Sequence, residues 1–342
     1  MTEEVVTSSV QNHFARYSHI ESELIIDGCL PNLLPDLSVM IPTFRRPYLL
    51  KEAIESVVNQ TAHGINIEIV VVDNDAKSDC AELITVINGF LPNNIRLFRN
   101  GENIGMFGNW NRCIELARAS VLTILNDDDL LHPDFIRITN ELARQSAISV
   151  EKVQFQEHMR FPEIKGKCNA KPLTLADFFL GNPINGSLGF VFNKLHAIEL
   201  GGYNPALWPT ADYDFSYRYF KRFGIKKIPA QLAGYRWLEN ESMQIVTLEG
   251  FLTNDIIFRK GVIREVKLSK LNKKIMSVLI ELMAVSASFF YKKINSDFNI
   301  ESNLSNNNVR KFGVITLFLL RNKYSHHIFI VILRLFCKKI MA

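Results

Sequence analysis

The sequence has few of the residues that mark secreted or metal-stapled proteins. Its 342 residues include only five cysteines, which are scattered and form no CxxC pair. This spacing argues against a disulfide framework or a zinc site and predicts a reducing compartment. The first twenty residues are polar and include Glu3 and Glu4, so we expect no signal peptide. With 47% hydrophobic residues, the chain can nevertheless bury a sizeable core.

From position 310 onward the chain has seven Lys or Arg and no acidic residue. The rest of the chain therefore contains 32 basic and 35 acidic residues. The apolar runs of this tail, Val314–Leu320 and Ile328–Leu333, are shorter than the ~18–20 residues of a spanning helix. We therefore expect no membrane-spanning segment. Interleaved apolar and basic residues predict a helix lying on an anionic membrane surface or one packed on the core. They argue against nucleic acid as a partner.

Strand-like and helix-like patterns alternate over residues 37–145. Buried apolar runs predict strands at 37–42, 67–73, 95–100 and 121–125, with helices expected near 47–61, 79–87 and 106–120 and after Pro133. Alternation of this kind predicts an α/β fold with a doubly wound, mostly parallel sheet. Ligands of such sheets bind at the carboxyl ends of the strands. Thr43, Asp73 and the acidic triplet 127–129 all fall at that edge.

The stretch "LTILNDDDLLHPDF" places three carboxylates directly after an apolar run. Mg²⁺ and Mn²⁺ prefer oxygen ligands and use one or two carboxylates, with water and substrate phosphates completing the shell. The alternative is a solvated loop or helix cap before Pro133.

Several segments together resemble a family 2 glycosyltransferase, whose nucleotide-binding sheet domain is called the GT-A fold. "SVMIPTFRRPYLLKEAIESVVNQT" is similar to the opening strand, loop and helix of that family, and "IEIVVVDNDAKSD" to its "VVVDDGSxD" element. "RNGENIGMFGNWNRCIELA" resembles the loop and helix before the metal motif, and "NDDD" the DxD element. "LGGYNPALWPTADYDFSYRYFKRFG" resembles "GGFDxxL…EDYDLxLRxxxxG". The resemblance covers about residues 37–242.

The resemblance implies a role for each matching position. Asp212 stands where the family has its catalytic base, with Asp214 in reserve because Ala211 replaces the usual glutamate. Asp127 and Asp129 would bind the metal, although Asn126 replaces an acid and leaves open which two of the three acids act. The donor nucleotide would be held by a larger set of residues: Pro42, Thr43, Phe44, Arg46, Asp73, Asp75, Asn103, Gly105, Asn109, Asp127, Asp128 and Arg236.

The implied reaction is inverting, metal-dependent transfer of one sugar from a nucleotide-diphosphate sugar to a glycan hydroxyl, in the synthesis of O-antigen or capsule polysaccharide. A carboxylate must take the proton of the attacking hydroxyl, while Mn²⁺ or Mg²⁺ offsets the charge of the leaving diphosphate. A UDP-sugar is the default donor, and the acceptor is expected to be linked to a polyprenyl diphosphate. The alternative is a non-catalytic or nucleotidyl-transferring sugar-nucleotide-binding protein of the same fold.

We expect three regions along the chain. Residues 1–35 form an extension, 36–260 the GT-A domain (36–145 the nucleotide-sugar half, 146–260 the acceptor half), and 261–342 a helical, membrane-associating region. In the last region a stripe at alternating steps of three and four predicts a long amphipathic helix: Leu268, Leu271, Ile275, Val278, Leu282, Val285 and Phe289. The expected location is the cytoplasm, peripheral on the inner face of the cell membrane.

Overall fold

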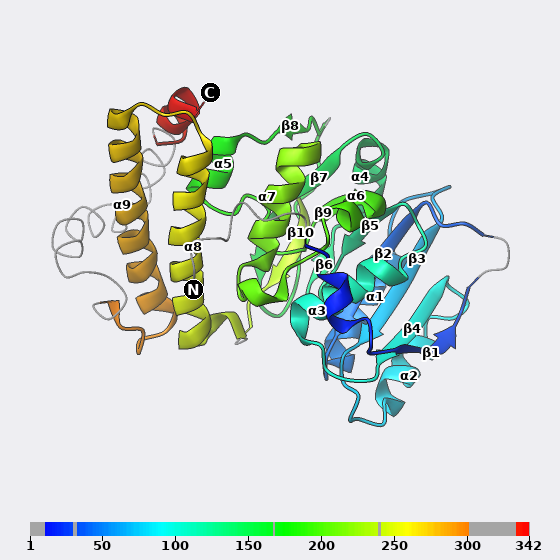
Figure 1. Cartoon of the computed structure of the whole chain (residues 1–342). Coiled ribbons are helices and arrows are strands. Elements are labelled where there is room, and N and C mark those ends of the chain that lie inside the picture. The colour runs from blue at the N-terminus through cyan, green and yellow to red at the C-terminus, as the bar shows by residue number, and fades with distance from the viewer. Residues whose placement is uncertain (1–10, 30–32, 167, 239–240, 301–332, 342) are drawn as a thin grey trace.

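The computed structural model describes residues 11–29, 33–166, 168–238, 241–300 and 333–341 (Figure 1). Within them, ten strands form one sheet. The strands are β1 (Ser22–Asp27), β2 (Leu37–Thr43), β3 (Ile67–Asp73), β4 (Ile95–Asn100), β5 (Val121–Ile124), β6 (Leu130–Leu131), β7 (Ala147–Phe155), β8 (Lys171–Pro172), β9 (Phe190–Asn193) and β10 (Ile225–Arg236). Their order is β1-β4-β3-β2-β5-β9-β7-β10-β6, with β8 beside β10.

Parallel pairing joins β4, β3, β2 and β5, and also β7 and β10. The antiparallel strand β9 lies between these two groups, pairing with β5 on one side and β7 on the other. The predicted α/β fold with a mostly parallel sheet is therefore confirmed.

The helices are η1 (Phe14–Tyr17), α1 (Pro47–Val58), α2 (Ala81–Asn88), α3 (Gly105–Leu116), α4 (Phe135–Ala143), α5 (Leu175–Leu180), α6 (Lys194–Glu199), η2 (Pro205–Leu207), α7 (Ala211–Phe223), η3 (Glu241–Met243), α8 (Ile245–Glu265) and α9 (Lys270–Ile294). Residues 333–341 form a further, C-terminal helix. In "YLLKEAIESVV" the apolar positions Leu50, Ala53, Ile54 and Val57 recur at helical spacing, so α1 buries one face. Pro47 stands at the start of α1, where its missing N–H costs no helical hydrogen bond.

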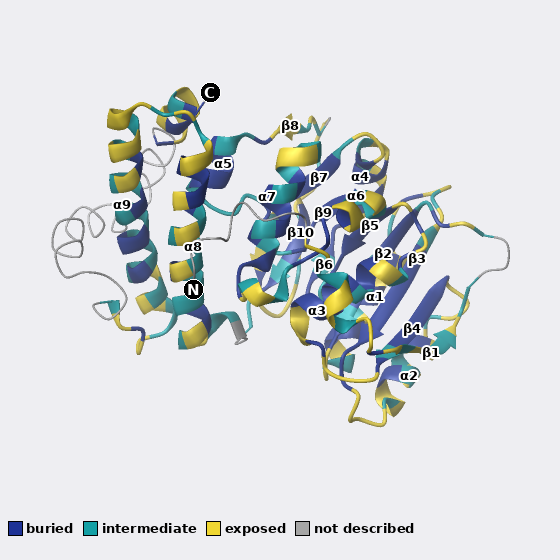
Figure 2. Ribbon diagram, in the orientation of Figure 1, coloured by how far each residue is buried: buried dark blue, intermediate teal, exposed yellow. Residues whose placement is uncertain are grey.

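Helices cover both faces of the sheet, and its central strands are buried (Figure 2). Alternate residues of each central strand belong to different cores. Met40 of β2 packs with α3, α5 and α7. Its neighbours Val39 and Ile41 pack instead with α1, α2 and α4. Because both faces are buried, the strands read as continuous apolar runs.

The N-terminal extension contributes an edge strand that the sequence pattern did not predict. Ser22–Asp27 pairs antiparallel with β4. Its residues are half-buried or exposed, so the segment lacks the apolar run by which the other strands were recognised.

Helices α8 and α9 form a long antiparallel hairpin beside the sheet domain, with the C-terminal helix next to the turn between them (Figure 1). The predicted stripe on α9 is only partly right. The buried residues are Met276, Ile280, Ala284, Val285 and Ser288. Of the predicted stripe only Val285 is among them, and Leu271 is 66% exposed. The pattern placed the helix correctly, but its apolar residues extend more than halfway around it and left the packed face undetermined.

One helix of the described residues is long and apolar enough to cross a membrane, which the apolar runs of the tail did not indicate. Lys270–Ile294 reaches a mean hydropathy of 1.5 over 18 residues, and a third of that window is buried inside the protein. The core helix of a soluble protein passes the same test. The two predicted apolar runs of the tail lie largely in residues 301–332, outside the described residues.

Candidate active site

The acidic triplet follows β5 in the turn to β6, at the carboxyl edge of the parallel strands. Asp127 is 6% exposed and accepts a 2.8 Å hydrogen bond from the Thr43 hydroxyl at the end of β2. Asp128 accepts a 2.8 Å bond from Nη1 of Arg46, which also lies 3.7 Å from Asp127. Two residues from the loop after β2 thus contact the first two acids.

Asp129 is turned inward and is fully buried. It accepts hydrogen bonds from Nδ2 of Asn126 at 2.9 Å and from the backbone N–H of Arg236 at 3.0 Å. Both donors are neutral. Among the described residues no Lys or Arg side chain forms an ion pair with Asp129.

These carboxylates have the properties that a divalent cation requires. Burial, together with the neighbouring charge of Asp128, raises the pKa of Asp127 to about 6 against the Thr43 bond and Arg46. The same two causes raise the pKa of Asp129. Buried carboxylates with too little compensating charge are stabilised by a bound cation. Within the described residues no three His, Cys, Asp or Glu side chains converge as a self-sufficient metal site, so phosphate or water oxygens would complete the shell.

The side chain of Arg236 makes its contacts within the protein. Its guanidinium donates to the backbone carbonyl of Asp128 at 2.9 Å, pairs with Glu52 and lies over the ring of Phe155. The residue is only 5% exposed. Through these contacts Arg236 stabilises the acidic turn. To contact a diphosphate directly, its guanidinium would have to break them.

A cavity of about 490 Å³ opens at the same edge, beyond β2 and β3. It is large enough for a nucleotide. Of the predicted donor-binding residues, Thr43, Arg46, Asp73 and Asp75 line it. The other lining residues are Arg45, Pro47, Lys77, Ser78, Asp79, Cys80, Ala81, Glu82 and Leu83.

The acids of this cavity already have partners. Asp73 accepts from Nε of Arg99 at 3.1 Å and from the backbone N–H of Asp75 at 2.9 Å. Burial raises its pKa although both contacts oppose the shift. Asp75 pairs with Arg45, whose hydrogen bond lowers the pKa of that carboxyl. Arg99 was not singled out from the sequence, since nothing in "IRLFRN" distinguishes it from the other arginines.

Three further predicted residues lie around the loop after β3 rather than in the cavity lining. Asn109 donates to the carbonyl of Val72 at 3.0 Å. Asn103 accepts from Nδ2 of Asn74 at 2.9 Å and from the N–H of Gly105 at 2.9 Å. These contacts connect α3 to the carboxyl end of β3, so they shape the loop that borders the cavity.

Pro42 and Phe44 flank Thr43 and differ in exposure. Pro42 is half-buried, while Phe44 is 39% exposed and lies against the guanidinium of Arg45. The backbone N–H of Phe44 points to Asp127 at 3.4 Å.

The two candidate bases on α7 have different surroundings. Asp212, in the first turn, accepts from Nδ2 of Asn182 at 2.6 Å and from the N–H of Gly186 at 2.8 Å. Burial raises its pKa, and the Gly186 amide opposes this. Asp214 instead pairs with Arg218 at 2.8 Å, and Arg218 also binds the carbonyls of Leu200 and Gly202. Asp214 therefore serves packing, while Asp212 is a half-buried carboxylate without an ion pair among the described residues.

Sequence reasoning missed the residues that hold Asp212. Asn182 and Gly186 come from the loop between α5 and β9, 30 and 26 positions earlier in the chain. Their segment, "NPING", carries turn-forming residues, which predict a loop but do not indicate what it contacts.

A two-sided α/β sheet with a cavity and clustered acids at its carboxyl edge defines the nucleotide-binding class of α/β proteins. Comparison with known proteins specifies the family. Residues 38–181 match the model described as glycosyl transferase family 2. Residues 38–181 therefore carry a glycosyltransferase family 2 domain, as the motifs predicted, and the fold is the GT-A fold of solved glycosyltransferases.

Individual relatives match less closely. The GalNAc(5)-diNAcBac-PP-undecaprenol beta-1,3-glucosyltransferase of Campylobacter jejuni is 28% identical over 57% of this chain and 65% of its own length. The chain spans no more than 66% of the length of the first curated relatives it matches.

Two solved structures share the fold at low identity. A mannosyltransferase of Pyrobaculum calidifontis in complex with GDP-Man and Mn²⁺ has a TM-score of 0.55 and 15% identity, covering 95% of this chain and 91% of that one. TarS 1–349 of S. aureus in complex with UDP-GlcNAc also has a TM-score of 0.55, with 14% identity, covering 78% and 83% of the two chains.

Proposed function

We propose that the chain is an inverting, metal-dependent glycosyltransferase that moves one sugar from a nucleotide-diphosphate sugar to a hydroxyl of a glycan acceptor. The observation that carries this proposal is the pairing of two unlike sites. One is an acidic turn beside a nucleotide-sized cavity. The other is a half-buried carboxylate, Asp212, at the start of α7. The first suits a donor diphosphate, and the second suits proton removal.

Asp212 would act as the general base. A sugar hydroxyl is a weak nucleophile at neutral pH, so a carboxylate must accept its proton as it attacks the anomeric carbon. Burial makes Asp212 a better proton acceptor than an exposed aspartate by raising its pKa. The amides of Asn182 and Gly186 fix its orientation. Attack from the side opposite the diphosphate inverts the configuration.

Asp127 and Asp129 would hold the cation, and Asp128 with Arg46 would border the diphosphate. When bound, Mn²⁺ or Mg²⁺ neutralises charge on the leaving nucleoside diphosphate. Arg46 contacts both Asp127 and Asp128, so it can move toward the diphosphate once a metal compensates these acids.

The proposed acceptor is a lipid-linked glycan in surface-polysaccharide synthesis. Its support is the name of the Campylobacter jejuni relative, which includes undecaprenol. The donor nucleotide stays open between UDP and GDP, because the two structural neighbours carry one of each.

The deciding test is release of nucleoside diphosphate from a panel of UDP-, GDP- and dTDP-sugars, with Mn²⁺ and with EDTA. We expect one donor to be turned over only with metal. The matched control is Asp127→Asn, which should lose the metal dependence and most of the activity. Metal-dependent binding of a donor without any turnover, with water or with polyprenyl-linked glycans as acceptors, would instead support a non-catalytic binding protein.

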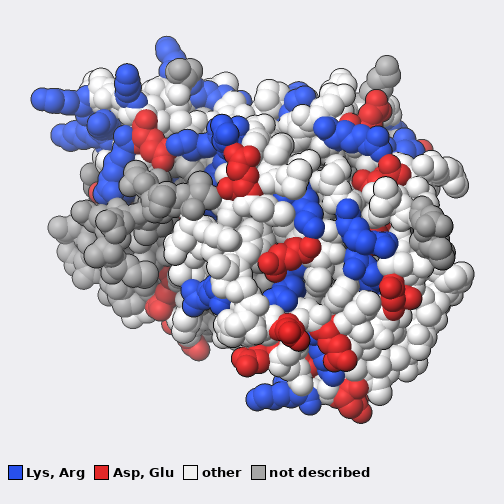
Figure 3. Space-filling view, turned by 45° about the vertical axis from the view of Figure 1, so that its right-hand side comes forward, with Lys and Arg blue, Asp and Glu red and all other residues white. Residues whose placement is uncertain are grey.

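We also propose that the protein attaches peripherally to an anionic membrane at the end where α8 turns into α9. Figure 3 shows Lys and Arg side chains gathered at that end of the molecule. Exposed residues there include Lys267, Lys270, Lys273 and Lys274 around the turn, and Leu335, Phe336, Lys338 and Lys339 on the C-terminal helix. Exposed apolar side chains among lysines suit the headgroup region of a membrane.

Substitutions test this attachment better than truncation. Removing the chain after Asn308 would also delete Leu333 and Cys337, which are buried in the core, and Arg334, which pairs with Asp177. We expect Lys273→Glu with Lys274→Glu to weaken binding to vesicles containing anionic lipid at least tenfold, since each lysine near such a surface contributes about 1 kcal/mol. Equal binding of the double variant and the parent chain would contradict the proposed surface.

A further inference from the structure

The loop between α5 and β9 contacts both sides of the candidate active site. Residues 182–187 lie between Asp212 on α7 and the acidic turn after β5. The loop is shaped by an internal bond from the Ile184 N–H to Oδ1 of Asn182 at 3.1 Å. Asn185 and Gly186 both have positive φ angles, of 55° and 92°.

On the base side, two donors of the loop meet one oxygen of Asp212. Nδ2 of Asn182 and the N–H of Gly186 both bond to Oδ2, at 2.6 and 2.8 Å. A Cβ at Gly186 would meet nothing within 4 Å, so space does not require glycine there. The φ of +92° does, because other residues are strained at such angles.

On the acid side, the loop reaches the triplet through one intermediate residue. Oγ of Ser187 bonds to Oδ1 of Asn126 at 3.2 Å. The other end of the Asn126 amide donates to Oδ2 of Asp129 at 2.9 Å. One loop therefore connects the proposed base to a proposed metal ligand.

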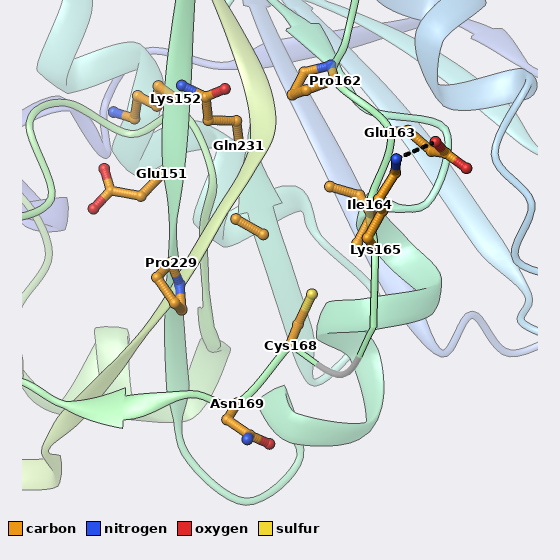
Figure 4. Close-up of a pocket in the computed structure, with 11 residues that line it drawn as sticks. Glu151, Lys152, Pro162, Glu163, Ile164, Lys165, Cys168, Asn169, Pro229 and Gln231 are labelled. Carbon is orange, nitrogen blue, oxygen red and sulfur yellow. Dashed lines mark ion pairs between the residues drawn. The ribbon is translucent and has the colours of Figure 1, made fainter.

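The side chain of Lys152 on β7 forms hydrogen bonds with this loop. Its Nζ donates to the carbonyl of Ile184 at 2.9 Å and to the carbonyl of Asn185. Lys152 lies at the edge of a second cavity, of about 500 Å³. Figure 4 shows its side chain directed away from the opposite wall, which residues 162–165, 168 and 169 form. The ammonium group thus binds the loop and does not point into that cavity.

We propose that Lys152 is a positioning residue that sets the geometry of Asp212 relative to the acidic turn by holding the loop 182–187. This inference rests on the proposed function of Asp212 as the base. Lys152 bonds to carbonyl oxygens only, so it acts on Asp212 through the loop and through its charge.

The charges around Lys152 agree with this role. The groups that act on it are Asp129, Asp212, Lys227 and Glu151. Burial lowers its pKa, and the two aspartates oppose that shift. In return the Lys152 charge favours the ionised form of Asp212. Removing the charge would therefore raise the pKa of Asp212 further.

A matched control exists elsewhere in the chain. Nζ of Lys194 also bonds to two backbone carbonyls, those of Glu115 and Ala117, at 2.9 and 2.6 Å. Burial lowers its pKa too. Lys194 is the first residue of α6, and its side chain reaches the end of α3. Its hydrogen bonds within the described structure involve neither the loop nor Asp212, so Lys194→Met removes the same kind of contact without reaching the site.

The first measurement needs no turnover. Hydrogen exchange of the full-length protein would be followed in a peptide spanning residues 182–187. We expect exchange at least tenfold faster in Lys152→Met than in the parent chain, a smaller change in Lys152→Arg, and no change in Lys194→Met. Equal exchange in Lys152→Met and Lys194→Met would overturn the proposal whatever the protein catalyses.

The second measurement is nucleoside-diphosphate release between pH 5 and 9, with the donor selected from the panel. We expect Lys152→Met to lower kcat about 100-fold, the order of loss that misplacement by ~1 Å produces. The acid limb should move to higher pH, and Lys152→Arg should recover at least a tenth of the parent rate. Binding of UDP or GDP with Mn²⁺ should change less than threefold.

A rate and pH profile of Lys152→Met equal to those of Lys194→Met would refute the positioning role while leaving the proposed function standing. Absence of turnover in the parent chain would count against the proposed function alone, and hydrogen exchange would still decide whether Lys152 holds the loop.

Discussion

Carboxylates are buried at both ends of the same parallel strands, with opposite consequences. At the amino end, Glu68 on β3 is fully buried and lies 2.6 Å from both Arg96 and Arg118. Burial favours its neutral form, but the Ser38 bond, the Arg118 amide and both arginine charges outweigh it and lower the pKa of Glu68. At the carboxyl end, burial prevails and raises the pKa values of Asp127 and Asp129.

The comparison separates an acid whose charge is compensated within the protein from acids whose charge is not. The charge of Glu68 is compensated by Arg96 and Arg118, so this ion-pair network stabilises the fold without a ligand. Asp127 and Asp129 have mostly neutral donors, although the chain has 39 Lys and Arg to draw on. A cluster of buried acids left short of charge is a mark of functional sites. The following substitutions test whether the two ends differ in this way.

The largest effect is expected for Asp212→Asn. The amide keeps the shape of the side chain but cannot accept the proton of the acceptor, so kcat should fall by about 10²–10⁴-fold. Binding of the nucleoside diphosphate should stay within threefold. Single-turnover kinetics with the donor found by the panel measures both quantities.

Glu68→Gln should leave the site intact and destabilise the fold. Arg96, which is buried, and Arg118, which is exposed, would both lose their counter-charge. Breaking a buried pair such as Glu68–Arg96 costs about 3–5 kcal/mol. Urea unfolding at pH 7 measures the loss in the free energy of unfolding. If the variant instead lost nucleotide binding while keeping its stability, the amino end of the sheet would not be the purely structural end.

The raised pKa of Asp127 predicts an unusual dependence of the free energy of unfolding on pH. Its pKa is about 6 in the folded chain and roughly 3.9 in an unfolded one, so the folded state binds this proton more tightly. The free energy of unfolding should therefore fall by up to about 3 kcal/mol as pH rises from 4 to 6. Asp127→Asn should reduce the fall, of which the raised pKa of Asp129 supplies a further part, and Mn²⁺ should restore more stability above pH 6 in the parent chain than in the variant. Urea unfolding at four pH values, with and without Mn²⁺, checks both.

Glu68 changes the free energy of unfolding with pH in the opposite direction. Its lowered pKa gives stability that is present above its unfolded value of roughly 4.3 and is lost as the pH falls further. The two ends of the sheet should thus produce separable pH ranges in one protein, and each single variant should change the dependence in its own range only.

The smallest effect is expected for Asp214→Asn. Its ion pair with Arg218 is partly exposed, so its loss should cost about 1 kcal/mol of stability or less. Turnover should stay within a few-fold of the parent chain, measured in the assay used for Asp212→Asn. A loss of activity as large as that of Asp212→Asn would show that the two acids had been assigned the wrong way round.

The parts of this fold that local pattern determines could be predicted from the sequence. The strands ending at Thr43 and Asp73 and the acidic turn follow from apolar runs closed by polar residues. Their meeting at one edge follows from the parallel topology. The motif resemblance added Asp212, which no local pattern would have identified.

What could not be predicted depends on contacts between distant residues. Lys152 reads as an ordinary lysine in "AISVEKVQF", and Asn182 as a turn residue, until the fold brings them to Asp212. The edge strand Ser22–Asp27 is too polar to be recognised alone and exists through its pairing with β4. Arg236 was expected at the diphosphate, yet its burial beside Glu52 is set by tertiary packing.

The central claim is most directly tested by following nucleoside-diphosphate release in the parent chain, Asp212→Asn and Asp214→Asn side by side, with one Mn²⁺-dependent donor. The account predicts turnover in the parent chain and in Asp214→Asn, and a loss of at least about 100-fold in Asp212→Asn with donor binding unchanged. Undiminished turnover in Asp212→Asn would contradict it.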